Sequence, residues 1–195
     1  MTISLHQRRR QKTARDIQMA TLELSLQKGL DQITTEEIAA FAGISTRTFF
    51  NYYKNKEAAA IGAPPAFRKE DTDALREGTA PLAHDLKLLL DKHMEILAGD
   101  KAILKMVGSV LRSNERARGI LEGFLTIERK NLEECLFARV KCHQTAVALA
   151  SLATNAIGQA IFLWEHEEGL PLGAALDTIW AGLINASQLL ANSTA

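Results

Sequence analysis

The sequence predicts an all-α protein made of a three-helix N-terminal head with a helix-turn-helix and a larger C-terminal helical domain. Apolar residues recur at intervals of three and four along most of the chain, without the alternation typical of strands. Two short helical patterns meet at Gly43 within residues 34–57, as in a helix-turn-helix. We expect the head at residues 8–62, a linker or irregular connection at residues 63–80, and the C-terminal domain at residues 81–192.

Charge is distributed unevenly along the 195 residues, although the whole chain is neutral. Residues 1–56 contain nine basic and five acidic residues, a net charge of +4, so the remainder, with 14 and 18, carries −4. A basic N-terminal quarter on an acidic body is suited to binding a polyanion. Many proteins that bind no nucleic acid share this asymmetry, so charge alone does not decide the function.

The composition indicates a soluble cytoplasmic protein. No segment approaches a run of about 18 apolar residues, and the basic N-terminus lacks the apolar stretch of a secretory signal. The two cysteines, Cys135 and Cys142, are too few for a disulfide framework and fit a reducing compartment.

The first helix of the head is expected to begin near residues 8–12 and to end at Lys28, before Gly29. Its inward face carries residues at helical spacing: Ile17, Ala20, Thr21 and Leu24. The cluster Arg8–Arg10 at its start is interpreted either as a contact to phosphates or a minor groove, or as a solvated tail. Both interpretations remain open.

Caps and a glycine define the helix-turn-helix. Thr34 and Glu37 form the capping pattern T-x-x-E of its first helix, Gly43 allows a turn with positive φ, and Ser45 caps the second helix. The second helix presents polar side chains on one side: Thr46, Arg47, Thr48, Asn51 and Tyr52. Hydroxyls and an arginine suit base edges and phosphates in a major groove. The alternative is an ordinary helical hairpin whose exposed face is polar.

A fourth helix is expected after a cap at Asn55. It should end near Gly62, because Pro64 and Pro65 block its continuation. Lys56 at its start is unfavourable against the helix dipole, and a bound phosphate would explain this position.

The C-terminal domain is expected to contain five helices, and the last two are rich in small and apolar residues. The approximate ranges are 81–98, 101–112, 114–140, 143–167 and 172–191. The last two helices suggest a four-helix bundle between two copies, with these residues at the dimer interface: Ala146, Ala150, Thr154, Gly158, Ile179, Trp180 and Leu183. The alternative is that both helices are buried inside one monomer.

Two stretches of the head resemble the signature of TetR-type (tetracycline-repressor-like) transcriptional regulators. GISTRTFFNYYKNKE is similar to the family pattern GVS-x-x-T-x-Y-x-Y-F-x-x-K-E, and ITTEEIAAFAG matches TTxxEIAxxAG. The resemblance covers residues 13–60, about a quarter of the chain. It implies DNA contacts at eight positions: Thr34, Ser45, Thr46, Arg47, Thr48, Asn51, Tyr52 and Lys56.

Individual roles follow from the same resemblance. Thr34 and Lys56 match positions that contact phosphates, and Arg47 is the best candidate for reading a guanine. Phe50 departs from the family, because it stands where a tyrosine hydroxyl usually bonds a phosphate. Tyr53 takes the usual place of a phenylalanine.

The resemblance implies a homodimeric, sequence-specific DNA-binding transcriptional regulator, a repressor released by a small-molecule effector. Its partners would be a palindromic double-stranded operator, a second copy of the chain and a small apolar or aromatic effector, with no membrane. Candidate pocket residues are Met94, Leu97, Met106, Val110, Phe124, Phe162 and Trp164, although such residues at helical spacing more often form a core. The alternative function is a dimeric helical interaction module that keeps the fold without specific operator binding.

Catalysis and metal binding have little support in the sequence. Cys135, Cys142 and His143 lie near one another, yet no C-x-x-C motif or histidine pair at i, i+4 accompanies them. No hydrolase, zinc-protease, P-loop or dinucleotide-binding motif occurs, so we expect neither enzyme activity nor a cofactor.

Overall fold

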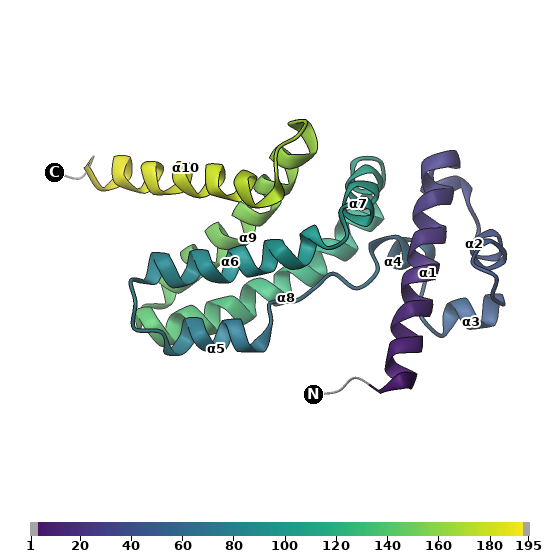
Figure 1. Ribbon diagram of the computed structural model, residues 1–195, viewed down its shortest axis with the longest axis horizontal. Helices are drawn as coiled ribbons and strands as arrows, with labels where there is room; N and C mark the ends of the chain where they lie inside the picture. The colour runs from purple at the N-terminus through teal and green to yellow at the C-terminus, as the bar shows by residue number, and fades with distance from the viewer. Residues whose placement is uncertain (1–3, 193–195) are drawn as a thin grey trace. The chain divides into compact units, whose positions relative to one another are not determined.

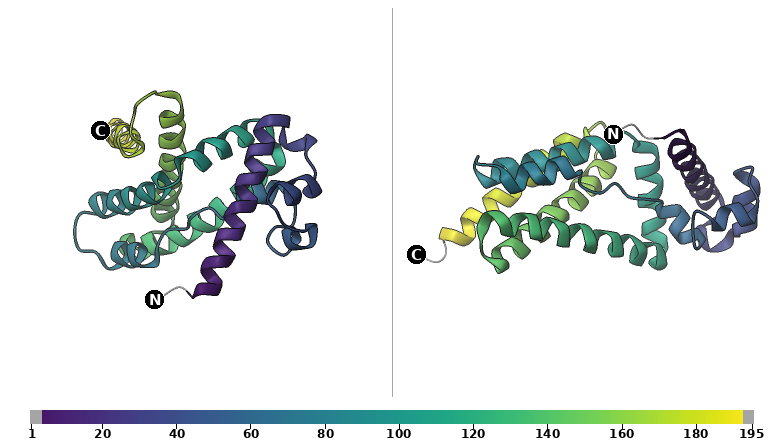
Figure 2. Two further views of the ribbon diagram at one scale, coloured as in Figure 1. Left: turned by 45° about the vertical axis from the view of Figure 1, so that its right-hand side comes forward. Right: turned by 90° about the horizontal axis from the view of Figure 1, so that it is seen from below.

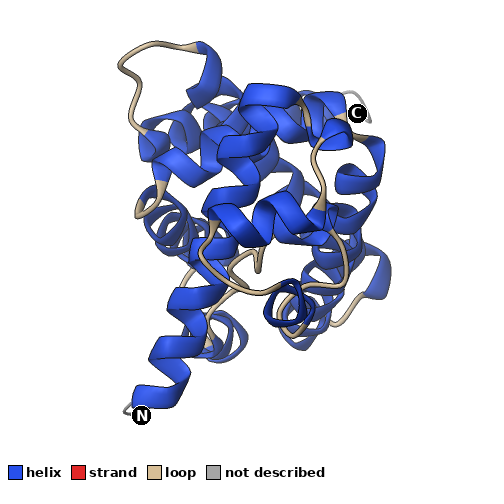
Figure 3. Cartoon of the chain, turned by 90° about the vertical axis from the view of Figure 1, so that its right-hand side faces the viewer, coloured by secondary structure: helices blue, strands red, loops and turns tan. Residues whose placement is uncertain are grey.

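The computed structural model describes residues 4–192, and within this range all regular structure is helical (Figures 1 and 3). The prediction of an all-α fold is therefore confirmed. The helices are α1 (Leu5–Lys28), the 3-10 turn η1 (Leu30–Gln32), α2 (Thr35–Phe41), α3 (Thr46–Phe50), α4 (Lys56–Ile61), α5 (Lys69–Glu77), α6 (Leu82–Ala98), α7 (Lys101–Ser113), α8 (Glu115–Val140), α9 (His143–His166) and α10 (Leu172–Asn192).

Contacts within the chain divide it into two compact units. The head unit takes in the described residues up to Pro64 together with Asp100–Phe124, and the body unit takes in Pro65–Gly99 and the described residues from Leu125 onward. Helix α7 and the first turns of α8 therefore belong to the head unit, which is larger than the expected residues 8–62. The reason is apolar packing, because Val110 and Ala117 are buried in the same core as α1.

Helix α1 begins earlier than residues 8–12, because a local cap starts it. The Ser4 hydroxyl accepts a hydrogen bond from the Gln7 backbone N–H, and the Gln7 side chain accepts one from the Ser4 backbone N–H. The helix ends at Gly29, whose φ of 86° suits a residue without Cβ. Its inward face buries Ile17 and Leu24, among others, at the centre of the head. In Figure 2 this purple helix is seen from two further sides.

The caps of the helix-turn-helix are as predicted. The Thr34 hydroxyl accepts from the Glu37 N–H at 3.1 Å, and the Glu37 carboxylate accepts from the Thr34 N–H at 2.9 Å. Gly43 makes the turn with φ 67° and nothing lies within 4 Å of the position of a Cβ, so the backbone angle is what calls for glycine there. Ser45 caps α3, which has only five residues.

Helix α4 is short, as expected, and is tied to α1. The Asn55 side chain caps it by accepting from the Ala58 N–H at 2.7 Å. It ends at Gly62 with φ 68°, directly before the two prolines. A Cβ at Gly62 would collide with the Gln18 side chain, which donates to the carbonyls of Ala60 and Ile61.

The segment 63–80, expected to be a linker or irregular connection, contains the helix α5. Ion pairs at helical spacing stabilise it, among them Arg68–Asp71 and Lys69–Asp73. Leu75 is its one fully buried apolar side chain, so the sequence shows almost no apolar periodicity there. Its charges do not indicate irregular structure, because they pair along the helix.

The body unit is a layered set of helices. Helix α9 packs mainly against α10 and also contacts α6, which in turn packs on α5. Leu86, Leu90 and Met94 of α6 are buried there, with Leu172 and Leu176 of α10. Some small residues of α9, such as Ala146 and Ala150, are buried in this core, whereas Gly158 and the C-terminal half of α10 are exposed. The choice between a dimer interface and burial within one monomer therefore stays open.

Among the described residues, α9 has the length and composition of a membrane-crossing helix, with a mean hydropathy of 1.6 in its most apolar window. Buried core helices of soluble proteins pass the same test, and 28% of this window is buried in α9.

Candidate nucleic-acid interface

At the start of α3 the hydroxyl groups of Ser45 and Thr48 are hydrogen-bonded to each other. Ser45 Oγ accepts from the Thr48 N–H at 3.1 Å and lies 2.9 Å from Thr48 Oγ1. These hydroxyls are therefore oriented before any ligand arrives, which reduces the ordering cost of a contact. Between them in the chain stand Thr46, half-buried, and Arg47, exposed.

Arg47 makes no hydrogen bond or ion pair with any residue that the structure describes. Its guanidinium group is therefore unpaired among the described residues, and it lies on the first turn of α3, the second helix of the helix-turn-helix. An arginine in this position can donate two parallel hydrogen bonds to the O6 and N7 atoms of a guanine. Exposed Lys54, just past α3, adds a second charge without a partner among the described residues.

A cluster of aromatic rings fixes α3 on the head. Phe49 is fully buried and serves as the anchor. The ring of Phe50 stands perpendicular to that of Phe49, with a centroid distance of 5.4 Å, and the Tyr53 ring lies 6.3 Å from Phe49. Phe50 itself remains 53% exposed.

The start of α1 holds the end of α3, a contact that the sequence did not reveal. Arg10 Nη2 donates to the Asn51 carbonyl at 3.5 Å, and the Arg10 guanidinium carbon lies 5.1 Å from the centroid of the Tyr52 ring. One turn further along α1, the Ala14 carbonyl accepts from the Tyr53 hydroxyl at 3.1 Å. Burial raises the pKa of Tyr53, so this hydroxyl stays protonated as a donor.

Arg10 is therefore engaged with the protein, whereas Arg8 and Arg9 are exposed and have no partner among the described residues. The cluster that the sequence left open between two interpretations thus has two parts. Arg10 positions α3, and the other two remain available to a phosphate.

Lys56 has a protein partner that explains its position. Its ammonium group donates to the carbonyls of Asp31 at 2.9 Å and Ile33 at 3.0 Å, at the end of η1. These carbonyls offset the unfavourable dipole of α4, so a phosphate is not needed to explain the lysine. A phosphate contact by Lys56 remains a prediction.

Helix α2 is braced by an ion pair to α1. Lys28 Nζ lies 2.9 Å from Glu37 Oε1, and the hydrogen bond from Lys28 is the main reason why the pKa of Glu37 is lowered. Glu37 is thereby kept ionised while it caps Thr34. The Thr34 hydroxyl is exposed. Besides its capping bond, its O–H donates to Glu37 Oε2 at 3.4 Å, so a DNA phosphate, which can only accept, would have to replace this carboxylate as the acceptor.

Asn114, between α7 and α8, is hydrogen-bonded to the segment just before the helix-turn-helix. Asn114 is buried, and its Nδ2 donates to Asp31 Oδ1 at 2.9 Å, while its Oδ1 accepts from the Ala117 N–H at 2.8 Å. Asp31 is the residue whose carbonyl receives Lys56. One buried amide thus joins the first turn of α8 to η1, immediately before α2.

The residues predicted for an effector pocket are divided between the two units. Met106 and Val110 pack in the head core, and Phe124 is the last residue of the head unit. The other four belong to the body: Met94 and Trp164, which are buried, Leu97, which is half-buried, and Phe162, which is exposed. Their common role as a pocket remains a prediction.

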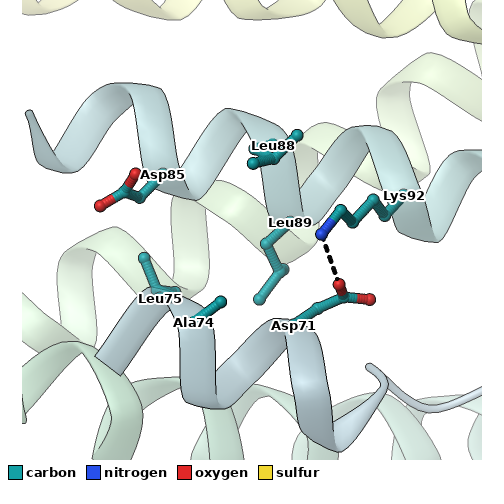
Figure 4. Close-up of a pocket in the computed structure, with 7 residues that line it drawn as sticks. All are labelled: Asp71, Ala74, Leu75, Asp85, Leu88, Leu89 and Lys92. Carbon is teal, nitrogen blue, oxygen red and sulfur yellow. Dashed lines mark hydrogen bonds and ion pairs between the residues drawn. The ribbon is translucent and has the colours of Figure 1, made fainter. Parts of the chain in front are cut away.

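The body contains a small cavity lined by other residues (Figure 4). Its volume of about 30 Å³ holds roughly one water molecule. Asp71 and Lys92 meet across it, with Lys92 Nζ 2.8 Å from Asp71 Oδ1. The remaining lining residues are Ala74, Leu75, Asp85, Leu88 and Leu89.

The residues predicted for a dimer interface differ in exposure. Ala146 and Ala150 are fully buried inside the single chain. Gly158 is exposed, whereas the other four are half-buried: Thr154, Ile179, Trp180 and Leu183. Only part of the set is therefore open to a second copy.

The cysteines do not form a shared site. Cys135 is buried, and its thiol donates to the Thr72 carbonyl at 2.9 Å, while Cys142 is exposed. Within residues 4–192 no group of three His, Cys, Asp or Glu side chains is arranged to hold a metal.

The head resembles a known group of regulators by sequence. Residues 17–59 match the family model described as "Bacterial regulatory proteins, tetR family". The chain is also similar to the "Fatty acid metabolism regulator protein" of Bacillus subtilis (strain 168), with 29% identity over 118 residues. This match covers 55% of the present chain and 60% of that protein, less than two thirds of its length.

Solved structures extend the similarity of fold to most of the chain. A putative TetR-family transcriptional regulator from Syntrophomonas wolfei str. Goettingen has a TM-score of 0.64 at 15% identity, covering 87% of this chain and 92% of that one. The transcriptional regulator FadR from Bacillus subtilis, solved in complex with stearoyl-CoA, has a TM-score of 0.51 at 24% identity, covering 85% and 95%. At these identities the likeness shows the fold alone.

Proposed function

We propose that this chain, whose head matches the model of the tetR family of bacterial regulatory proteins, is a DNA-binding transcriptional regulator and acts as a homodimeric repressor. In this proposal the dimer binds a palindromic operator in the cytoplasm, and a small apolar effector releases it. The alternative of an interaction module without operator binding is an outcome of the experiments below.

The observation that supports DNA binding most directly is the exposed, unpaired arginine on α3. Arg47 is exposed without a partner among the described residues, beside hydroxyls that Ser45 and Thr48 hold in place. The head also has the excess of basic residues that phosphate binding requires. Arg47 would read a base, and the hydroxyls of Thr34, Ser45 and Thr48 would fix the register on the backbone.

The body offers the surface for a dimer. Its last two helices expose large apolar side chains: Leu152 and Phe162 on α9, and Ile184, Leu189 and Leu190 on α10. Where such side chains form a continuous patch, the patch marks a protein–protein interface. Because Ala146 and Ala150 are buried, the proposed interface uses the exposed face of α9 and the C-terminal half of α10. A twofold dimer would present two α3 helices to successive major grooves, about 34–36 Å apart.

A fatty acyl thioester is the first effector to test. The sequence relative from Bacillus subtilis is named a fatty acid metabolism regulator, and an acyl chain fits the apolar effector that the sequence predicts. The cavity shown in Figure 4, about 30 Å³, is far below the roughly 300 Å³ of a ligand pocket, so an acyl chain would enter it only if the helices around it parted. Release from DNA then requires that the effector bind the parted state more tightly than the closed one.

Selection of bound duplexes from a random pool tests operator recognition. The purified full-length protein should be dimeric by light scattering and should enrich a palindrome whose half-sites are about one helical turn apart. A folded dimer that enriches no motif would support the interaction module and overturn the repressor.

Release is tested on the selected operator with long-chain acyl-CoA. Micromolar stearoyl-CoA should lower operator occupancy, and free coenzyme A at the same concentration is the matched control. If both leave the occupancy unchanged, the acyl thioester is excluded as the effector, while operator recognition stands on its own result.

A further inference from the structure

Resting on the proposed operator recognition, we infer that Phe50 reads the C5-methyl group of a thymine in each half-site, beside the base that Arg47 reads. Phe50 would thus be a second specificity-determining residue of α3.

The position of Phe50 is the first reason. It follows Arg47 by three residues, and side chains three apart on a helix lie on the same face. Its ring is 53% exposed on the helix that carries the free guanidinium. An aromatic ring in this place leaves apolar surface in water until something covers it.

The chemistry of the major groove is the second reason. Phe50 has no polar atom, so it can form only apolar contacts with DNA. The one apolar group that base edges present in the major groove is the thymine methyl, and it distinguishes thymine from the other bases. A ring without a hydroxyl has nothing to offer a phosphate, and where it reaches the base edges it favours thymine without any hydrogen bond.

The rigidity of the ring is the third reason. The rings of Phe50 and Phe49 are nearly perpendicular, at 88°, with a centroid distance of 5.4 Å, and Phe49 is fully buried. An aromatic pair of this geometry is favourable and restricts the exposed ring. A side chain that is already oriented loses little conformational entropy when DNA covers it.

The chain also supplies a control. Phe41 on α2 is 52% exposed, almost the same as Phe50, but it is not on α3. If exposed phenylalanines of the head served only to contact another protein, the two would be equivalent. The inference predicts that they differ.

The experiment replaces thymine in the selected operator by deoxyuridine, which lacks the C5-methyl group. Each duplex carries the replacement at one thymine position, made in both half-sites. For the wild-type protein, the replacement at one of these positions should lower the affinity for the operator by about fourfold per half-site. This factor corresponds to about 0.8 kcal/mol for one buried carbon. The variant Phe50→Ala should bind the thymine operator more weakly and lose the difference between thymine and uracil at that position. The variant Phe41→Ala should keep the difference.

Three results would overturn the inference while leaving operator recognition intact. One is a wild-type protein that is indifferent to uracil at every thymine. Another is a Phe50→Ala variant that discriminates thymine from uracil as well as the wild type does. The third is an equal loss of thymine discrimination in Phe50→Ala and Phe41→Ala, which would indicate that both changes act by loosening the head. Failure of the wild type to enrich any operator would instead overturn the proposed function, and this inference with it.

Discussion

Removal of the Asn114 side chain should loosen the helix-turn-helix without disturbing the body. This amide donates to Asp31 Oδ1 at 2.9 Å and accepts from the Ala117 N–H at 2.8 Å. It is 5% exposed, so a truncated side chain leaves the Ala117 N–H in a poorly hydrated gap. The variant Asn114→Ala breaks the joint between the first turn of α8 and η1.

The size of the effect follows from the two lost hydrogen bonds. Loss of a helix N-cap costs about 0.5–2 kcal/mol. Loss of a hydrogen bond to a charged group costs about 1.5–3 kcal/mol, and the lower end applies because the Asp31 carboxylate is exposed and water can replace the amide. We expect the opening free energy of the head to fall by about 2–3 kcal/mol.

Hydrogen exchange measured by mass spectrometry locates this loss. Backbone amides of α2 and α3 should exchange about 30- to 150-fold faster in Asn114→Ala, since about 1.4 kcal/mol corresponds to a factor of ten. Amides of α9 and α10 should be unchanged. The matched control is Asn131→Ala, which removes an exposed asparagine of the same helix whose amide donates to Glu128 at 3.2 Å.

A second variant separates the cap from the cross-link. Asn114→Asp keeps an acceptor for the Ala117 N–H but turns a carboxylate toward Asp31. Two neighbouring carboxylates raise one pKa, so the folded variant binds a proton more readily than the unfolded chain and gains stability as pH falls. If Asn114→Ala changed the exchange of α2 and α3 no more than Asn131→Ala does, the proposed support of the helix-turn-helix by α8 would be refuted.

Three further predictions concern single side chains. Arg47→Ala should weaken operator binding by about 1–3 kcal/mol and relax the preference at one base pair. Lys54→Ala should weaken binding to all sequences alike and reduce the slope of log affinity against log salt concentration by about 1. Quantitative footprinting at several salt concentrations separates the two effects. Arg10→Ala should weaken operator binding by about 0.5–1 kcal/mol, because the stacking on Tyr52 that positions the end of α3 is lost, and Arg10→Lys should restore only part of it. Burial lowers the pKa of His93 to about 4, so the unfolded chain binds a proton at this histidine first as pH falls. The free energy of unfolding should therefore fall by up to about 3 kcal/mol between about pH 6.5 and pH 4. Urea titrations of His93→Leu should show a flatter pH dependence.

Local features of the head were predictable because each rests on neighbouring residues. The capping box of Thr34 and Glu37, the caps at Ser45 and Asn55, and the turn at Gly43 need only a few adjacent side chains. The cap at Ser4 is equally local and was missed, because it lies outside the apolar pattern that was used to place α1.

Contacts between distant segments could not be read from the sequence. The ammonium group of Lys56 reaches carbonyls 23 and 25 residues away, and Arg10 reaches Asn51, 41 residues away. Neither spacing leaves a pattern along the chain. The assignment of α7 to the head unit also depends on such contacts, because its apolar face is the same whichever unit it packs against.

The body helices illustrate a different limit. The ridge of small residues on α9 predicts close packing by another helix, but it does not say whether that helix belongs to the same chain. The structure buries Ala146 and Ala150 within one chain, so packing was predicted and the partner was not.

The most direct test of sequence-specific recognition compares the affinity of the dimer for its selected operator with that for a scrambled duplex of equal length, at physiological salt. The account predicts a ratio of at least about 10³, and a decline of both affinities as salt rises, because phosphate contacts release counterions. Equal affinity for the two duplexes would contradict it.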